Sequence, residues 1–293
     1  MAEIIIQQNR KKGVALALLA WLSFGLMNIV VVLTPPAVGI MEQTFFRNLP
    51  MLLGVAYLCH KKRISYFGKK EYYPHVLARS VCGFFAVLMS FYSTRHAAIA
   101  DVTIMYRMDM FTITAVSALI LHEKLGKVHI LAMAAAFLGA FIAANPRFDS
   151  SFLPMLTAFG VALCDTVSYP MMSYLAGRID SLCVLMGFCS FSMVGTIPFL
   201  LTDFVVPHGT ALLNLLLIGL FAGLGQVLMT FSYRYAPAGE LSIYSQLAIV
   251  MNAILGYLFL GQVPGSRTII GGSLVLAASV GLCVYKQHYG NKT

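Results

Sequence analysis

The sequence predicts an all-α membrane protein, in which ten transmembrane helices form two inverted five-helix repeats (5+5). Three observations support this fold class: the composition, the length of the apolar runs and a corner that occurs twice. Of the 293 residues, 59% are hydrophobic and 11% are charged, and the mean hydropathy is +0.81. Soluble domains carry about 25% charged residues. The composition therefore excludes an ordinary soluble domain.

Ten apolar runs are long enough to cross a membrane, because about 20 residues at about 1.5 Å per residue span the ~30 Å of hydrocarbon. Residues 13–147 and 150–287 then form two repeats of five spans, and residues 1–12 and 288–293 are cytoplasmic tails. We place the spans at residues 13–34, 38–59, 76–94, 100–121, 128–145, 152–176, 181–202, 211–233, 239–260 and 267–286.

A polar corner occurs once in each half of the chain. Arg95–Asp101 reads R-H-A-A-I-A-D and Arg234–Glu240 reads R-Y-A-P-A-G-E, so an Arg, an Ala and a final carboxylate coincide. Each repeat has an odd number of spans, and the second copy therefore enters the membrane upside down relative to the first. Inverted repeats are typical of secondary transporters, whose binding site lies between the repeats near the membrane midplane.

The formal net charge of +9 is distributed unevenly over the expected loops. Most Lys and Arg residues fall in segments on the side of the N-terminus, and the enrichment of these residues in cytoplasmic loops places both termini in the cytoplasm. We therefore expect a multi-pass protein of the cell membrane (bacterial inner membrane). The basic loop from His60 to His75 is interpreted as a topology determinant that faces anionic lipid. Nucleic acid is not expected as a partner.

The chain resembles a known family in its layout and in two short motifs. The ten-span 5+5 layout, the pattern F-Y-x-x-x-x-A-x-x-A-D at Phe91–Asp101 and the pattern L-x-E-K-L at Leu121–Leu125 resemble the EamA-type members of the drug/metabolite transporter (DMT) superfamily. The resemblance covers about residues 13–287 and implies a secondary carrier for small metabolites. It also implies a cavity lined by spans one, three, four, six, eight and nine, with spans five and ten at the periphery.

Spans five and ten carry small residues four positions apart, a pattern that lets helices approach closely. We therefore leave open a homodimer through these two spans. The other expected partners are the lipid bilayer and a small-molecule substrate. The small residues are Ala135, Gly139 and Ala143 in span five and Ser273, Ala277 and Gly281 in span ten.

Span four carries Arg107 and Asp109 well inside its apolar run, where charged side chains are costly and typically functional. On a continuous helix, residues two apart point in nearly opposite directions, so we expect that these side chains do not neutralise each other. Arg47 in span two reaches the depth of Asp109, and an ion pair between them is one interpretation. Arg107 would then be free to bind a substrate carboxylate or phosphate through its forked donors. The alternative is that Arg107 pairs with Glu42 or Asp101 near the outer surface.

Asp165 in span six and Arg79 in span three lie toward the inner side of the membrane. Arg79 is close enough to the interface to reach water along its flexible stem. Asp165 has no obvious partner at its own depth except Arg79. Because burial disfavours the charged form of a carboxyl group, we treat Asp109 and Asp165 as candidates for proton coupling. A purely structural pairing of Asp165 is the alternative.

Aromatic and amide side chains in the spans complete the expected substrate site. Aromatic rings can stack on a ring or hold an ammonium group, and buried amides can bind a polar solute; the alternatives are packing and helix-to-helix hydrogen bonds. The expected substrate-binding residues are Tyr106, Arg107, Asp109, Tyr92, Trp21, Asn28, Tyr244, Gln246, Asn252 and Gln226, and Tyr169 could extend the aromatic wall.

These features predict a secondary active transporter that moves a small polar metabolite, an amino acid or related zwitterion, by alternating access, with proton coupling left open. The chain has no nucleotide-binding G-x-x-x-x-G-K-[ST] motif. The alternative is a carrier of a cationic amine or drug, such as a choline-like solute. A distant alternative is an intramembrane enzyme, which we do not expect because the histidines fall in loops or at span ends.

No cofactor or metal is expected either. All six cysteines lie in or at the ends of apolar spans. The sequence has no C-x-x-C pair, so neither a disulfide nor a metal site is expected.

Overall fold

The computed structural model describes residues 10–121, 127–144, 152–236, 241 and 244–289. The regular secondary structure within these ranges is helical. The L-x-E-K-L motif after Leu121 and the end of the second corner after Ala236 lie outside the described residues. The helices are α1 (Arg10–Leu33), α2 (Ile40–Lys62), the 3₁₀ helix η1 (Lys70–Tyr72), α3 (Tyr73–His96), α4 (Ile99–Tyr106), α5 (Asp109–Leu121), α6 (Lys127–Ala144), α7 (Phe152–Leu175), α8 (Ser181–Asp203), α9 (Thr210–Ser232), α11 (Leu247–Leu260) and α12 (Ser266–Tyr289).

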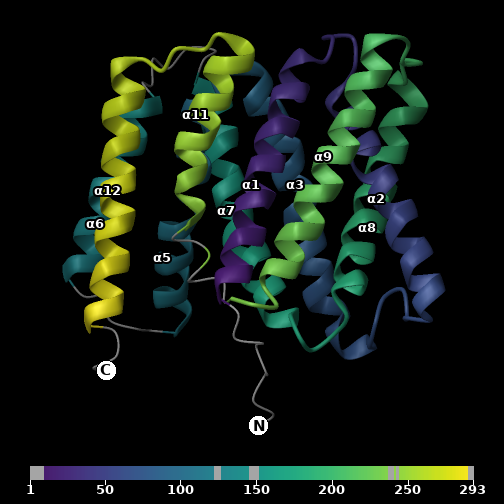
Figure 1. Cartoon of the computed structure of the whole chain (residues 1–293), viewed down its shortest axis with the longest axis horizontal. Helices are drawn as coiled ribbons and strands as arrows, with labels where there is room; N and C mark the ends of the chain where they lie inside the picture. The colour runs from purple at the N-terminus through teal and green to yellow at the C-terminus, as the bar shows by residue number, and fades with distance from the viewer. Residues whose placement is uncertain (1–9, 122–126, 145–151, 237–240, 242–243, 290–293) are drawn as a thin grey trace.

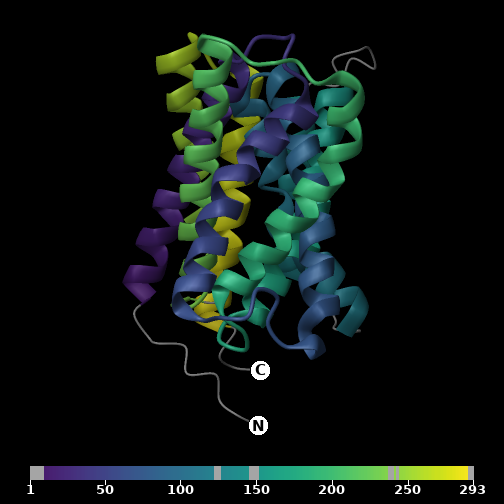
Figure 2. The same ribbon diagram turned by 90° about the vertical axis from the view of Figure 1, so that its right-hand side faces the viewer.

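The helices run side by side along one bundle axis, and the start of α1 and the end of α12 lie at the same end of the bundle (Figures 1 and 2). Within the described residues, five helices are long and apolar enough to cross a membrane. Large apolar side chains cover the outside of the bundle; Leu201 is 83% exposed and Leu131 is 71% exposed. Such a surface is typical of a protein that contacts lipid. The fold is that of a multi-pass membrane protein.

Span four differs from its expected form. A continuous helix over residues 100–121 was expected, but α4 ends at Tyr106 and α5 begins at Asp109. Span nine was expected over residues 239–260; its later part is α11, which begins after Gln246. The remaining expected spans each coincide with one helix, with ends that differ by a few residues.

The pairing of the helices separates a centre from a periphery. α1 packs against α9 and α11, and α3 packs against α7 and α8. α2 packs against α8 and α9, while α12 and α6 pack mainly against each other and form one edge of the bundle (Figure 1). The expectation that spans five and ten are peripheral is therefore met.

The two repeated corners lie at opposite ends of α1. Arg95 donates a 2.8 Å hydrogen bond to the carbonyl of Val38, in the connection that follows the end of α1. Beyond Arg234, the ring of Tyr235 lies 4.6 Å from the ammonium group of Lys12, at the start of α1. Because 24 helical residues extend about 36 Å, the corners are separated by roughly the thickness of a membrane.

The small residues of α6 and α12 serve different surfaces. A Cβ atom added at Gly139 would lie 2.7 Å from the carbonyl oxygen of Gly271, so the backbones of α6 and α12 touch at this point. Ala277 and Gly281 of α12 are instead exposed. The close approach that the small residues of span five predicted occurs within one chain. A homodimer through the exposed stripe of α12 stays a prediction.

Replacing Gly271 by valine should lower the stability of the protein by about 1–3 kcal/mol, the usual cost of overpacking a tight contact. The added Cβ would press on the Gly139 carbonyl and lie 2.8 Å from the Cβ of Ala143. The matched control is Gly281→Val on the same helix, where an added Cβ meets nothing within 4 Å. Thermal denaturation in detergent compares the two variants, and equal melting temperatures would contradict the packing described here.

Single cysteines at His96 and Arg234 should be accessible from opposite sides of the membrane. Both side chains are exposed, and both belong to the corners at the two ends of α1. In a background without the native cysteines, a membrane-impermeant maleimide should label His96→Cys in intact cells and Arg234→Cys only after permeabilisation. Labelling of both cysteines from one side would contradict the topology.

Candidate functional site

A cavity of about 130 Å³, with charged and polar side chains in its wall, lies among the central helices of the bundle. Its wall comes from α1, α3, α4, α7, α9 and α11, the spans that the resemblance implied, with one side chain each from α2 and α8. Aliphatic side chains fill the remainder of the wall. The polar and aromatic lining residues are Trp21, Phe24, Asn28, Arg47, Arg79, Ser90, Tyr106, Arg107, Asp165, Ser168, Tyr169, Phe188, Gln226 and Asn252.

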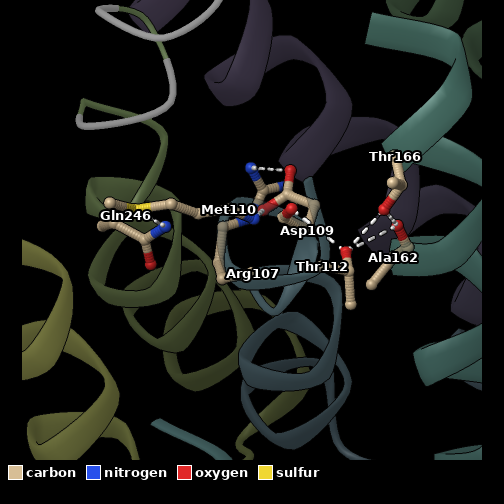
Figure 3. Close-up of polar contacts among 7 residues, drawn as sticks. All are labelled: Arg107, Asp109, Met110, Thr112, Ala162, Thr166 and Gln246. Atoms are coloured by element: carbon tan, nitrogen blue, oxygen red, sulfur yellow. Dashed lines mark hydrogen bonds and ion pairs between the residues drawn. The ribbon is translucent and has the colours of Figure 1, made fainter. Parts of the chain in front are cut away.

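The break between α4 and α5 brings Arg107 and Asp109 together. Arg107 ends α4 with ψ near 0°, and the guanidinium Nη1 of Arg107 lies 3.8 Å from Oδ2 of Asp109. Figure 3 shows the two side chains turned toward each other at the break. The expectation that they point in opposite directions was wrong, because it assumed a continuous helix. A turn at Arg107 and Met108 replaces the helical geometry there.

Asp109 also stabilises the start of α5. Its Oδ1 accepts a 2.8 Å hydrogen bond from the backbone N–H of Met110, in the first turn of the helix, where side chains commonly accept from the backbone N–H groups. A carboxylate in the first turn also interacts favourably with the helix dipole. Asp109 is 2% exposed and does not line the cavity, so it holds Arg107 from behind.

Further hydrogen bonds fix α5 against α7. The hydroxyl of Thr112 lies 2.5 Å from the hydroxyl of Thr166, and Thr112 also donates to the carbonyl of Asp109 at 3.1 Å. These contacts appear to the right of the ion pair in Figure 3. The position of Arg107 is therefore set by a partner on its own chain segment and by a neighbouring helix.

Gln246, in the second half of the chain, lies close to the break between α4 and α5. The alignment that sets Arg95 over Arg234 also sets Arg107 over Gln246, the residue directly before α11. Nε2 of Gln246 approaches the sulfur of Met110 at 3.9 Å, as Figure 3 shows. The residue of the second half that aligns with Arg107 thus lies against the start of α5, three residues beyond Arg107.

Two further arginines lie in the cavity wall against a single aromatic ring. The guanidinium carbons of Arg79 and Arg47 lie 4.6 Å and 5.5 Å from the centre of the Phe188 ring. Arg47 also donates a 3.0 Å hydrogen bond to the side chain of Asn48. It forms no ion pair with Asp109, although both residues are described, so that interpretation was wrong. Arg79 is 4% exposed and does not reach water at the membrane interface.

Tyr106 lines the cavity while α3 holds its hydroxyl group. The phenol donates to the carbonyl of Ser90 at 3.0 Å and lies 2.7 Å from the hydroxyl of Ser93. A third contact, with Thr94, measures 3.2 Å. The hydroxyl of Tyr106 is thus committed to the protein, and its ring is the part left for a ligand.

The structure gathers most of the expected site residues and leaves four outside the wall. Asp109 lies against Arg107, and Gln246 lies against Met110. Tyr92 stacks on His96, with ring centres 4.4 Å apart, and Tyr244 is 37% exposed; neither lines the cavity. The expected residues that line it are Trp21, Asn28, Tyr106, Arg107, Asp165, Tyr169, Gln226 and Asn252.

Arg47 and Phe188 were not among the expected site residues, and Arg79 was assigned more readily to the membrane interface. The sequence gives depth along a helix, and it does not show which face of the bundle either arginine occupies. The presence of an arginine inside an apolar span could have identified both as site residues, because such a residue needs a partner or a ligand.

Comparison with known proteins places this fold and cavity in a family. The sequence profile of the EamA-like transporter family matches residues 11–145 and again residues 152–284. The pseudopaline exporter CntI of Pseudomonas aeruginosa is 29% identical over 278 residues, which cover 93% of this chain and 96% of the exporter. An uncharacterised transporter of Helicobacter pylori is 27% identical over 92% of this chain and 93% of its own length.

Two further comparisons are more distant or partial. A riboflavin transporter of Rhizobium johnstonii is 30% identical over 58% of this chain and 57% of its own length. A solved crystal structure superposes with a TM-score of 0.65 and 16% identity, covering 94% of this chain and 96% of that one, which supports the fold alone. Because the family profile matches nearly all of the sequence in two segments, the chain belongs to the EamA-like transporter family of the DMT superfamily.

Proposed function

We propose that this protein is a secondary carrier that moves a small polar, carboxylate-bearing metabolite, such as an amino acid or related zwitterion, through the central cavity by alternating access. The observation that carries the proposal is the cavity itself, where three guanidinium groups and one carboxylate meet among otherwise apolar helices. Buried charges are retained in membrane spans mainly where they serve a substrate or ion path. The membrane of action is proposed to be the bacterial inner membrane, with both termini cytoplasmic.

The mechanism rests on the two halves of the chain acting as inverted repeats. The opposite placement of the corners at Arg95 and Arg234 and the contact of Gln246 with Met110 support this arrangement. Rocking of one repeat against the other would open the cavity to each side in turn. The exporter that matches nearly the full chain favours export as the direction of transport.

Asp165 is the proposed coupling residue. Both Asp109 and Asp165 were candidates, but Asp109 is engaged with Arg107 and with the N–H of Met110. Asp165 lines the cavity and is 7% exposed. A proton on its carboxyl group would therefore change the charge that a solute meets, whereas a proton on Asp109 would chiefly release Arg107.

A carrier for a cationic amine or drug is the second candidate. The aromatic residues Trp21 and Tyr169 in the wall favour it, since such rings can hold an ammonium group. The excess of arginine over carboxylate groups in the cavity wall disfavours a cationic substrate. Competition separates the candidates: an organic cation should block uptake only if the second candidate holds, and a carboxylate analogue only if the first does.

Replacing Arg107 by alanine should reduce transport by about 10- to 100-fold, because a hydrogen bond to a charged group contributes about 1.5–3 kcal/mol. The assay is uptake by proteoliposomes, screened first with labelled amino acids, amines and nucleosides to find a transported solute. The matched control is Arg178→Ala. Arg178 stacks on Tyr174 outside the cavity, so the Arg178→Ala variant should transport the solute normally. If no solute moves, or if both variants transport alike, the proposed site is wrong.

Replacing Asp165 by asparagine should uncouple transport from a pH gradient. Asparagine keeps the size of the side chain but cannot exchange a proton, so accumulation against a gradient should be lost while solute exchange at equal pH persists. The control is Asp101→Asn, since Asp101 accepts a 2.6 Å hydrogen bond from Thr268 away from the cavity. Unchanged pH-driven accumulation by Asp165→Asn would rule out coupling through this residue.

A further inference from the structure

The charged groups of the cavity wall do not balance. Arg47, Arg79 and Arg107 line the cavity and are 3%, 4% and 7% exposed, and Asp165 is the carboxylate among the lining residues. Asp109 neutralises Arg107 from behind. Asp165 can offset the charge of one of the two other arginines. With both carboxylates ionised, one guanidinium group is left in excess, and protonation of Asp165 leaves two.

The excess lies with Arg47 and Arg79, because Asp109 offsets the charge of Arg107. Nε of Arg47 and both Nε and Nη1 of Arg79 are buried without a hydrogen-bond partner, as are Nε and Nη1 of Arg107. Their shared contact is the ring of Phe188, which attracts a cation but accepts no conventional hydrogen bond. A buried guanidinium of this kind is costly unless an anion meets it.

We infer that the transported solute carries a net negative charge and places a carboxylate against Arg47 and Arg79. This inference rests on the proposed function and narrows its substrate class. A neutral zwitterion would leave the wall with its excess positive charge, whereas a solute with one more carboxylate than ammonium groups would balance it. The forked donors of arginine match a carboxylate in geometry as well as charge.

The charge of the ligand can be tested with three linear four-carbon solutes. Succinate, 4-aminobutyrate and putrescine have similar size but are dianionic, zwitterionic and dicationic. Binding at millimolar concentration stabilises the purified full chain by mass action. Succinate should raise the melting temperature in detergent most, 4-aminobutyrate less, and putrescine not at all. The absence of a succinate shift, or an equal shift from either other solute, would overturn the inference.

Methionine variants separate a binding role from a structural one. Arg79→Met keeps an unbranched stem and removes the excess charge, so the unliganded protein should melt at a higher temperature and lose its response to succinate. Arg47→Met should behave in the same way. Arg107→Met is the matched contrast, because it strands the buried carboxylate of Asp109 and should lower the melting temperature. If Arg79→Met and Arg47→Met also lower it, the two arginines are structural and the inference fails.

The inference and the proposed function can fail separately. If proteoliposomes move a neutral or cationic solute and succinate gives no thermal shift, the carrier function is supported and the inference of an anionic substrate is contradicted. If proteoliposomes move no solute in the screen, the proposed carrier function is contradicted. A succinate response that disappears in Arg79→Met would then identify anion binding without transport.

Discussion

The need to compensate charge inside an apolar bundle determines the centre of this protein. Arg107 and Asp109 are two residues apart and would lie on opposite faces of a helix, each exposed to a different neighbour. Ending α4 at Tyr106 and starting α5 at Asp109 places them 3.8 Å apart instead. The same carboxylate accepts a hydrogen bond from the N–H of Met110 in the first turn of α5. One side chain thus offsets the buried charge and stabilises the start of α5.

The cavity follows from where the break lies. α5 is tied to α7 through Thr112 and Thr166, and the residue before α11 approaches Met110 from the other half of the chain. The halves therefore meet through polar and irregular backbone at the middle of the bundle, while the outer surface stays apolar. Irregular backbone at membrane depth is tolerated where it is buried in protein or lines a cavity. A cavity with a polar wall beside the α4–α5 break is thus an arrangement that the lipid environment permits.

The sequence predicted the helices well because the thickness of hydrocarbon sets their length and lipid sets their composition. It did not predict the break, since Met108 is neither proline nor glycine and the charges of Arg107 and Asp109 were interpreted as substrate groups on a continuous helix. The wrong geometry of Arg107 followed from that one assumption. Arg47 and Arg79 were misjudged for another reason: residue number gives depth along a helix, but the side of the bundle depends on packing between α2, α3 and α8.

The two halves differ in charge at the α4–α5 break and at the aligned positions before and in α11, and this difference bears on alternating access. The positions that align with Arg107 and Asp109 are Gln246 and Ala248, so the charge lies in the first half and the second is neutral there. A ligand shifts a conformational equilibrium only by its differential affinity for the two states. An empty cavity leaves the excess charge of the buried Arg47 and Arg79 without a partner, at a large desolvation cost. Under the proposed function, an anionic solute removes that cost, and its binding and the closure of the cavity become coupled.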